Sequence, residues 1–105
     1  MAITVTKANA CTNGSSFFGT TIRTTPNALI ALAKRVGADY HEQNDGMDKT
    51  NFDFTFESKH GVFTVYDYKK YRSLELDKHI DFHIGGFSKA VTEQSKDALM
   101  DNDCF

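Results

Sequence analysis

The chain has 105 residues, a length typical of one domain, and its 40% hydrophobic and 25% charged residues are ordinary for a soluble globular protein. A formal net charge of -2 argues against a protein that coats polymeric nucleic acid, because such proteins carry a basic excess. No segment approaches the roughly 20 apolar residues of a membrane span, and the first residues lack the pattern of a signal peptide. We therefore expect one cytosolic domain over residues 1–105, with residues 1–16 as a candidate for a loosely ordered N-terminal segment.

The opening quarter of the chain contains two strand candidates. Residues 2–6 (AITVT) form a short one, and residues 8–16 are small, turn-forming residues typical of a loop. Residues 16–25 (SFFGTTIRTT) are rich in aromatic and β-branched side chains, which predicts a strand. Gly19 interrupts this strand, and a glycine inside a strand indicates a bulge or a close backbone approach.

Residues 25–37 (TPNALIALAKRVG) contain the clearest helix signal. Thr25 can cap the N-terminus, Pro26 suits the first helical position, and Gly37 suits the position just past the end. The apolar side chains recur at helical spacing and give the helix one apolar face: Leu29, Ile30, Leu32, Ala33 and Val36. The following residues 41–50 are polar and are predicted to form a connection.

The second half of the chain predicts a β-hairpin, a further strand and a final helix. Residues 52–57 alternate phenylalanine with polar residues, which is the period of a half-buried strand. Residues 58–61 (SKHG) are predicted to form a turn, and residues 62–69 (VFTVYDYK) the partner strand. The alternation in residues 79–84 predicts another strand, and residues 88–100 a helix whose first residue, a serine, can serve as its cap.

The predicted order of elements is therefore strand, strand, helix, three strands and helix. This order is typical of an antiparallel sheet with its helices packed on one face. We predict a small single α+β domain with an antiparallel sheet of about four to five strands and two helices.

Metal and catalytic motifs are weak in this sequence. His79 and His83 lie four residues apart on a predicted strand, about 13 Å at ~3.3 Å per residue, which is too far for one ion to bridge. Asp81 lies between them but does not complete a ligand set. His83 beside Asp67 or Asp81 could form a general acid–base pair, although such pairs arise by chance in any domain. We predict no metal site, no cofactor and no catalytic residue.

Two stretches combine aromatic residues with polar or cationic groups. Residues 64–72 (TVYDYKKYR) interleave tyrosines with lysines and an arginine; aromatic faces stack on nucleobases, and cations neutralise phosphate. Residues 17–25 (FFGTTIRTT) add aromatic rings, hydroxyls and Arg23, which can hydrogen-bond phosphate oxygens. Ordinary strands with a packed face and a solvated face produce the same patterns. If the stretches form a site, a small anionic ligand fits the charge balance better than a polymer.

The pair Gly85–Gly86 lies between the last predicted strand and the final helix. A tight turn is the ordinary explanation. Free backbone amides near the start of a helix also bind anions, so the pair is a candidate cradle for phosphate oxygens.

Four stretches follow one another between Phe17 and Gly86: FFGTTIRTTPNALI, DKTNFDFTFES, GVFTVYDYKKYR and FHIGG. They resemble a family of small phage proteins with a Phe-x-Gly-Thr start, a Tyr-Asp-Trp-Lys-like strand and a Trp-His-Ile-Gly-Gly-like strand end. We identify this family with the viral sponge proteins that antagonise cyclic-oligonucleotide antiphage signalling, called anti-CBASS proteins. Tyr68 and Phe82 stand where the family pattern has tryptophan, so both positions keep an aromatic ring.

The resemblance implies a non-enzymatic phage immune-evasion protein in the host bacterial cytoplasm. It would sequester cyclic di- or oligonucleotides such as cyclic GMP-AMP, with neither a membrane nor a polymeric nucleic acid as partner. A homo-oligomer is also implied, since a small two-fold ligand is naturally held where equivalent surfaces meet across an axis.

The same resemblance implies a set of ligand-binding residues. Aromatic rings would enclose the bases, while a lysine, a threonine and the glycine amides would take the phosphates. The implied residues are Phe18, Gly19, Thr20, Thr21, Tyr68, Lys69, Tyr71, His83, Gly85 and Gly86.

Two other functions stay open from the sequence. A small domain with an aromatic surface also suits a phage protein that inhibits a host protein by direct binding. A cyclic-nucleotide phosphodiesterase is the third possibility, since a single histidine can assist hydrolysis of a phosphodiester.

Overall fold

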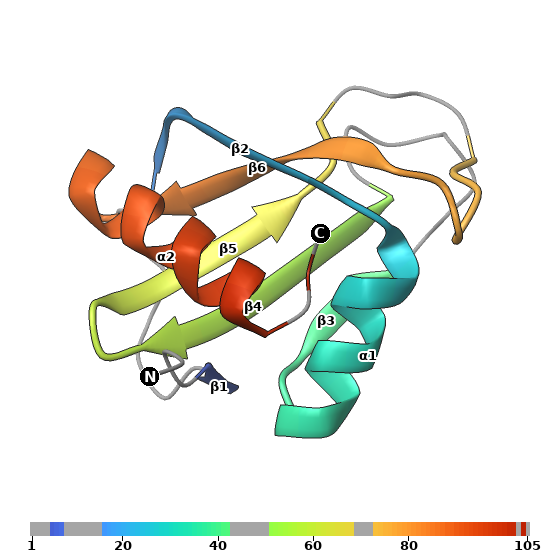
Figure 1. The fold of residues 1–105 in the computed structure, drawn as a ribbon, viewed down its shortest axis with the longest axis horizontal. Helices are drawn as coiled ribbons and strands as arrows, with labels where there is room; N and C mark the ends of the chain where they lie inside the picture. The colour runs from blue at the N-terminus through green and yellow to red at the C-terminus, as the bar shows by residue number, and fades with distance from the viewer. Residues whose placement is uncertain (1–4, 8–15, 43–50, 69–72, 103, 105) are drawn as a thin grey trace.

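The computed structural model describes residues 5–7, 16–42, 51–68, 73–102 and 104. Over these residues the chain forms two helices and a six-stranded sheet (Figure 1). The elements in chain order are β1 (Thr6–Lys7), β2 (Ser16–Thr24), α1 (Pro26–Val36), β3 (Tyr40–Glu42), β4 (Phe52–Ser58), β5 (Gly61–Tyr66), β6 (Ile80–Gly86) and α2 (Lys89–Asp101). The predicted α+β class is confirmed.

Every strand pair in the described sheet is antiparallel, and the strand order is β1-β4-β5-β6-β2. β3 pairs with the beginning of β4, beside Phe52 to Phe54, whereas β1 pairs with its end, beside Phe56 and Glu57. β2 therefore forms one edge of the sheet. The described sheet exceeds the predicted four to five strands because β3, only three residues long, was not predicted. The strand predicted at residues 2–6 corresponds to β1, which it overlaps at Thr6.

The prediction that residues 41–50 form only a polar connection was wrong at its beginning. His41 and Glu42 lie in β3, opposite Asp53 and Phe52. The local sequence is too polar to indicate a strand, and pairing with β4 makes it one. Tertiary context overrides local propensity at such short edge strands.

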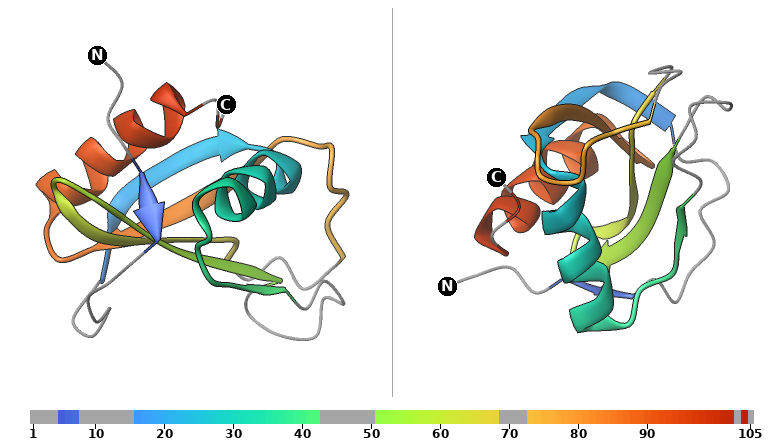
Figure 2. Two further views of the ribbon diagram at one scale, coloured as in Figure 1. Left: turned by 90° about the horizontal axis from the view of Figure 1, so that it is seen from below. Right: turned by 90° about the vertical axis from the view of Figure 1, so that its right-hand side faces the viewer.

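Both helices lie on one side of the curved sheet (Figure 2). The alternating phenylalanines of β4 point to this side, and Phe52, Phe54 and Phe56 are fully buried, as the period-two pattern predicted. They pack in one core with Leu29 and Leu32 of α1 and with Leu99 of α2. Burying a side chain of this size stabilises the fold by roughly 1.5–3 kcal/mol.

The predicted helix ends are also confirmed. The Thr25 hydroxyl accepts a hydrogen bond from the Ala28 amide, and Gly37 ends α1 in the left-handed conformation with φ 73°. The Ser88 hydroxyl accepts one from the Val91 amide at the start of α2. None of the helices in the described part of the chain is long and apolar enough to cross a membrane.

Gly19 marks a bulge in β2, as predicted. Its φ of 95° lies in the region that favours glycine, and the β2–β6 register shifts between Phe17 and Thr21. An irregular edge strand also discourages pairing with other chains.

Candidate functional site

A cluster of four rings lies on the sheet face away from the helices. His83 of β6 stacks on Phe17 of β2, with ring centroids 4.0 Å apart and an interplanar angle of 10°. The centroid of the His83 ring also lies 5.5 Å from that of Tyr66 and 5.2 Å from that of Tyr68. The two tyrosine rings meet edge to face, with their centroids 6.3 Å apart. We call these four residues the aromatic platform. Phe17 and Tyr68 are 42% and 40% exposed, so the platform presents ring surface to solvent.

Strand pairing brings these side chains together. Tyr66 lies opposite His83 in the β5–β6 register, and opposite residues of antiparallel strands point to the same face. Phe17 lies opposite Gly85, the residue two positions after His83. Because Gly85 has no side chain, the Phe17 ring can lean along the sheet and stack on His83.

The glycine pair is placed differently from the sequence interpretation. Gly85 and Gly86 lie inside β6 and pair on both sides, with β2 and with β5, rather than between the strand and the helix. In a central strand the backbone amides face the neighbouring strands. The two glycines therefore offer no exposed backbone amides to a phosphate. The prediction ended the strand at residue 84, whereas β6 continues to Gly86.

Close packing explains both glycines instead. A Cβ on Gly86 would lie 3.1 Å from Thr92 Cγ2 and 3.2 Å from Val91 Cγ1, so this glycine lets α2 approach the sheet. On the opposite face, a Cβ on Gly85 would lie 2.7 Å from Thr64 Oγ1 and 3.7 Å from Tyr66 Cε1. Gly85 therefore sets the spacing at the platform.

We expect Gly85→Ala to lower the free energy of unfolding by about 1–3 kcal/mol, the range for overpacking a well-packed site. The added methyl group meets the Thr64 hydroxyl, so part of the loss should disappear in the double variant Gly85→Ala/Thr64→Ala. Urea unfolding of the four proteins of this cycle measures both effects. Strictly additive changes would contradict the proposed contact.

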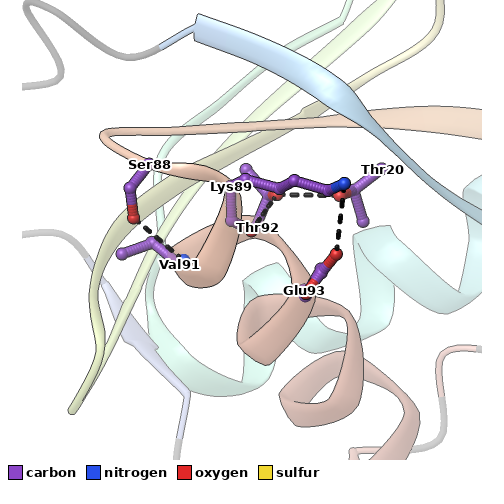
Figure 3. A network of polar contacts seen from close by, with 6 residues as sticks. All are labelled: Thr20, Ser88, Lys89, Val91, Thr92 and Glu93. Atoms are coloured by element: carbon purple, nitrogen blue, oxygen red, sulfur yellow. Dashed lines mark hydrogen bonds and ion pairs between the residues drawn. The ribbon is translucent and has the colours of Figure 1, made fainter.

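Residues 18–21 line a separate pocket on the helix side of the sheet. This pocket of about 640 Å³ lies between β2 and α2, and its other wall consists of Lys89, Glu93, Lys96 and Asp97. Beside the pocket, the hydroxyls of Thr20 and Thr92 share a hydrogen bond of 2.8 Å that joins β2 to α2, and Lys89 Nζ lies 4.0 Å from Glu93 Oε1 (Figure 3). The two lysines are balanced by two acidic residues, so the lining does not select an anion.

A third feature adjoins the aromatic platform on the open face. A pocket of about 360 Å³ is lined by Asp39, Tyr40, His41, Asp53, Thr55 and Thr64, and we call it the β3–β5 pocket. Asp53 lies opposite Tyr66 in the β4–β5 register, and Thr64 lies opposite Gly85. The pocket and the platform thus form one continuous surface across β3, β4, β5, β6 and β2.

Two titratable groups at this junction, Asp53 and Tyr66, have shifted pKa values. Burial raises the pKa of the Asp53 carboxyl; the charge of His41 opposes this shift, and the carboxylate of Asp67 adds to it. Burial also raises the pKa of the Tyr66 hydroxyl, with further contributions from Asp53 and Tyr68. No hydrogen bond or ion pair joins Asp53 to any other described side chain, and the charge of His41 offsets the cost of its burial only in part.

Asp53→Asn should therefore stabilise the fold at neutral pH. Because the pKa of Asp53 is higher in the folded state than in the unfolded state, ionisation of this carboxyl destabilises the fold. The destabilisation is complete at pH values well above the folded-state pKa, and it vanishes at pH values below the unfolded-state pKa of 3.8. The variant should have the higher urea midpoint at pH 7, and the two midpoints should converge near pH 3. An equal gain at both pH values would show that burial of the charge is not the cause.

The structure brings together only part of the residue set implied by the resemblance. Tyr68 and His83 lie in the platform and Gly85 lies beneath it, while residues 18–20 belong to the helix side. Thr21 lines the helix-side pocket although it lies opposite His83 in the strand register. Lys69 and Tyr71 lie outside the described residues.

Sequence reasoning missed two members of the platform, Phe17 and Tyr66. The period of two in the strand could have identified Tyr66, because Thr64, Tyr66 and Tyr68 share one face. The choice between Phe17 and Phe18 could not be made in this way, because the bulge at Gly19 breaks the alternation that relates a residue to a face.

The carboxylates considered as partners of His83 have other contacts. Asp67 accepts three hydrogen bonds from Asn51 and Phe52, and Asp81 Oδ1 lies 3.6 Å from Arg23 Nη1. Among the described residues, no group of three or more His, Cys, Asp or Glu side chains could hold a metal ion.

No protein-family model matches the chain, and neither a curated protein nor a solved structure matches it.

Proposed function

We propose that this protein binds cyclic di- or oligonucleotide second messengers, such as cyclic GMP-AMP, and sequesters them without cleaving them. The aromatic platform carries the proposal. Each nucleobase has a π face, and stacking on an aromatic side chain contributes ~1–3 kcal/mol per base. Phe17 and Tyr68 both keep ring surface exposed, so the platform has area for more than one base.

The rings of the platform also contact one another without a ligand, as a pre-organised site requires. The stacked pair of Phe17 and His83 and the edge contact between Tyr66 and Tyr68 limit the rotamers of these rings. Pre-organisation reduces the entropy lost on binding. This matters for a sponge, because a protein that only binds must hold its ligand near nanomolar, about -12 kcal/mol, to compete with a receptor.

Phosphate recognition is assigned to the cationic residues that follow Tyr68 in the sequence, Lys69 first among them. A lysine adjacent to a stacking ring suits a nucleotide, because base and phosphate are separated only by the sugar. A binding role is favoured over hydrolysis because Asp67 and Asp81, the candidate partners of His83, already contact other residues.

The motif resemblance supports the biological setting of the proposal: a phage immune-evasion protein acting in the host bacterial cytoplasm as a homo-oligomer. A cyclic dinucleotide has near two-fold symmetry, and two platforms related by a two-fold axis would present equivalent rings to its two bases.

Co-purification of ligand tests the proposal. The purified protein is mixed with a panel of cyclic dinucleotides, freed of unbound nucleotide, and heated, and the released material is analysed by chromatography. Intact nucleotide is expected. A linear product would indicate a phosphodiesterase, and failure to bind any nucleotide would overturn the proposal in favour of direct inhibition of a host protein.

A further inference from the structure

We infer that the β3–β5 pocket makes the nucleotide site selective for guanine, with the Asp53 carboxylate as the residue that reads the base. The inference rests on the proposed function, because it assumes that a base stacks on the aromatic platform. It adds the identity of that base and the residue that recognises it.

The first step is the position of Asp53 relative to the platform. Asp53 lies directly opposite Tyr66, and opposite side chains of an antiparallel pair have Cβ atoms roughly 4.5–5.5 Å apart on the same face. A base stacked on the platform over β5 and β6 therefore has one edge toward β4. That edge meets Asp53, with the hydroxyls of Thr55 and Thr64 beside it in the same pocket.

The second step is the state of the carboxylate. Asp53 is half-buried, and no described side chain forms a hydrogen bond or ion pair with it. A half-buried carboxylate without donors is unfavourable, and the raised pKa of Asp53 reflects this. A ligand that supplies N–H donors would remove the penalty on binding.

The third step is the chemistry of the bases. An ionised carboxylate only accepts hydrogen bonds, and its two oxygens match two parallel donors. The Watson–Crick edge of guanine presents adjacent N1–H and N2–H donors. Adenine and cytosine present one amino donor next to a ring-nitrogen acceptor, which would face the second carboxylate oxygen unfavourably.

The fourth step is the direction of the phosphates. Asp39 and Asp53 both line the β3–β5 pocket, with His41 as the one basic side chain of its lining, so a phosphate placed there would meet two carboxylates against at most one cation. A base edge is therefore the favoured occupant of this pocket, and the sugar and phosphates point toward the other end of the platform, away from β4.

Matched ligands provide the test: isothermal titration of cyclic di-GMP and of cyclic di-AMP into the wild-type chain, Asp53→Asn and Asp97→Asn. Asp97→Asn removes the same charge on α2, on the other side of the sheet. The wild-type protein should bind cyclic di-GMP about tenfold or more tighter than cyclic di-AMP, the range of a good bidentate contact. Asp53→Asn should abolish this preference, mainly by weakening cyclic di-GMP, and Asp97→Asn should retain it.

The outcomes separate this inference from the proposed function. Equal affinity of the wild-type protein for both ligands, or a guanine preference that survives Asp53→Asn, would overturn guanine selection and leave nucleotide binding intact. Absence of binding by both ligands would overturn guanine selection, and absence of binding across the whole nucleotide panel would overturn the proposed function as well. Urea unfolding of Asp53→Asn checks that the variant is folded, and it is expected to be at least as stable as the wild-type protein at pH 7.

Discussion

Phe17→Ala should weaken the binding of a cyclic dinucleotide by about tenfold or more, whereas Phe18→Ala should change it by less than about twofold. The two residues are neighbours in β2 and are 42% and 41% exposed, so they are matched in type, position and accessibility. Only Phe17 contributes a ring to the aromatic platform, through its stack on His83. Phe18 lines the helix-side pocket between β2 and α2.

Isothermal titration with cyclic di-GMP measures the two affinities, and thermal unfolding shows whether each variant retains the wild-type fold. The reverse pattern, a large loss in Phe18→Ala alone, would move the ligand to the helix-side pocket. Equal losses would mean that the edge strand as a whole, rather than one ring, contributes to binding. Either result would contradict the platform as the site of base stacking.

The fold was largely predictable because its main elements have strong local signals. The three phenylalanines of β4 alternate strictly, and α1 has a cap, a proline and a terminal glycine in the positions that helices prefer. The short strands β1 and β3 were predicted less well: among the described residues the strand predicted at residues 2–6 matches β1 only at Thr6, and β3 has no strand signal in the sequence. They exist because β4 offers backbone partners on its free side, which is information that only the assembled sheet contains.

The candidate site was less predictable for two physical reasons. The platform joins residues from β2, β5 and β6, and the bulge at Gly19 hides which of two adjacent phenylalanines faces His83. The glycine pair has a sequence typical of an anion cradle, yet it serves close packing against Thr64 on one face and Val91 on the other. In an anion site and in a packed sheet alike, glycine allows another group to approach the backbone closely. The sequence does not reveal whether that group is a ligand or a neighbouring side chain.

Asp67 holds in place the segment that carries Tyr68 of the platform. The residue is fully buried, at the end of β5 and next to Tyr68. Its Oδ1 accepts the amides of Asn51 and Phe52 at 2.8 Å each, and its Oδ2 accepts Asn51 Nδ2 at 3.0 Å. These three bonds join the chain leaving β5 to the beginning of β4.

Asp67→Ala is therefore expected to lower the free energy of unfolding by about 4 kcal/mol or more, since each buried donor left without an acceptor costs about 1–3 kcal/mol. That is a large part of the roughly 5–15 kcal/mol that stabilises a typical domain. Asp67→Asn should fall between Ala and wild type, because an amide oxygen can still accept two backbone amides while its NH₂ group meets Asn51 Nδ2. Urea unfolding at pH 7 measures all three proteins.

Asp81→Ala is the control for this series, because it also removes a carboxylate near the open face. Its pair with Arg23 is exposed, and such pairs contribute about 0–1 kcal/mol, so the unfolding midpoint should hardly change. If Asp67→Ala proved no more damaging than Asp81→Ala, the three buried bonds could not be what fixes β5 to β4. The position of Tyr68, one residue beyond Asp67, would then need another explanation, and so would the pre-organised platform that the proposed function requires.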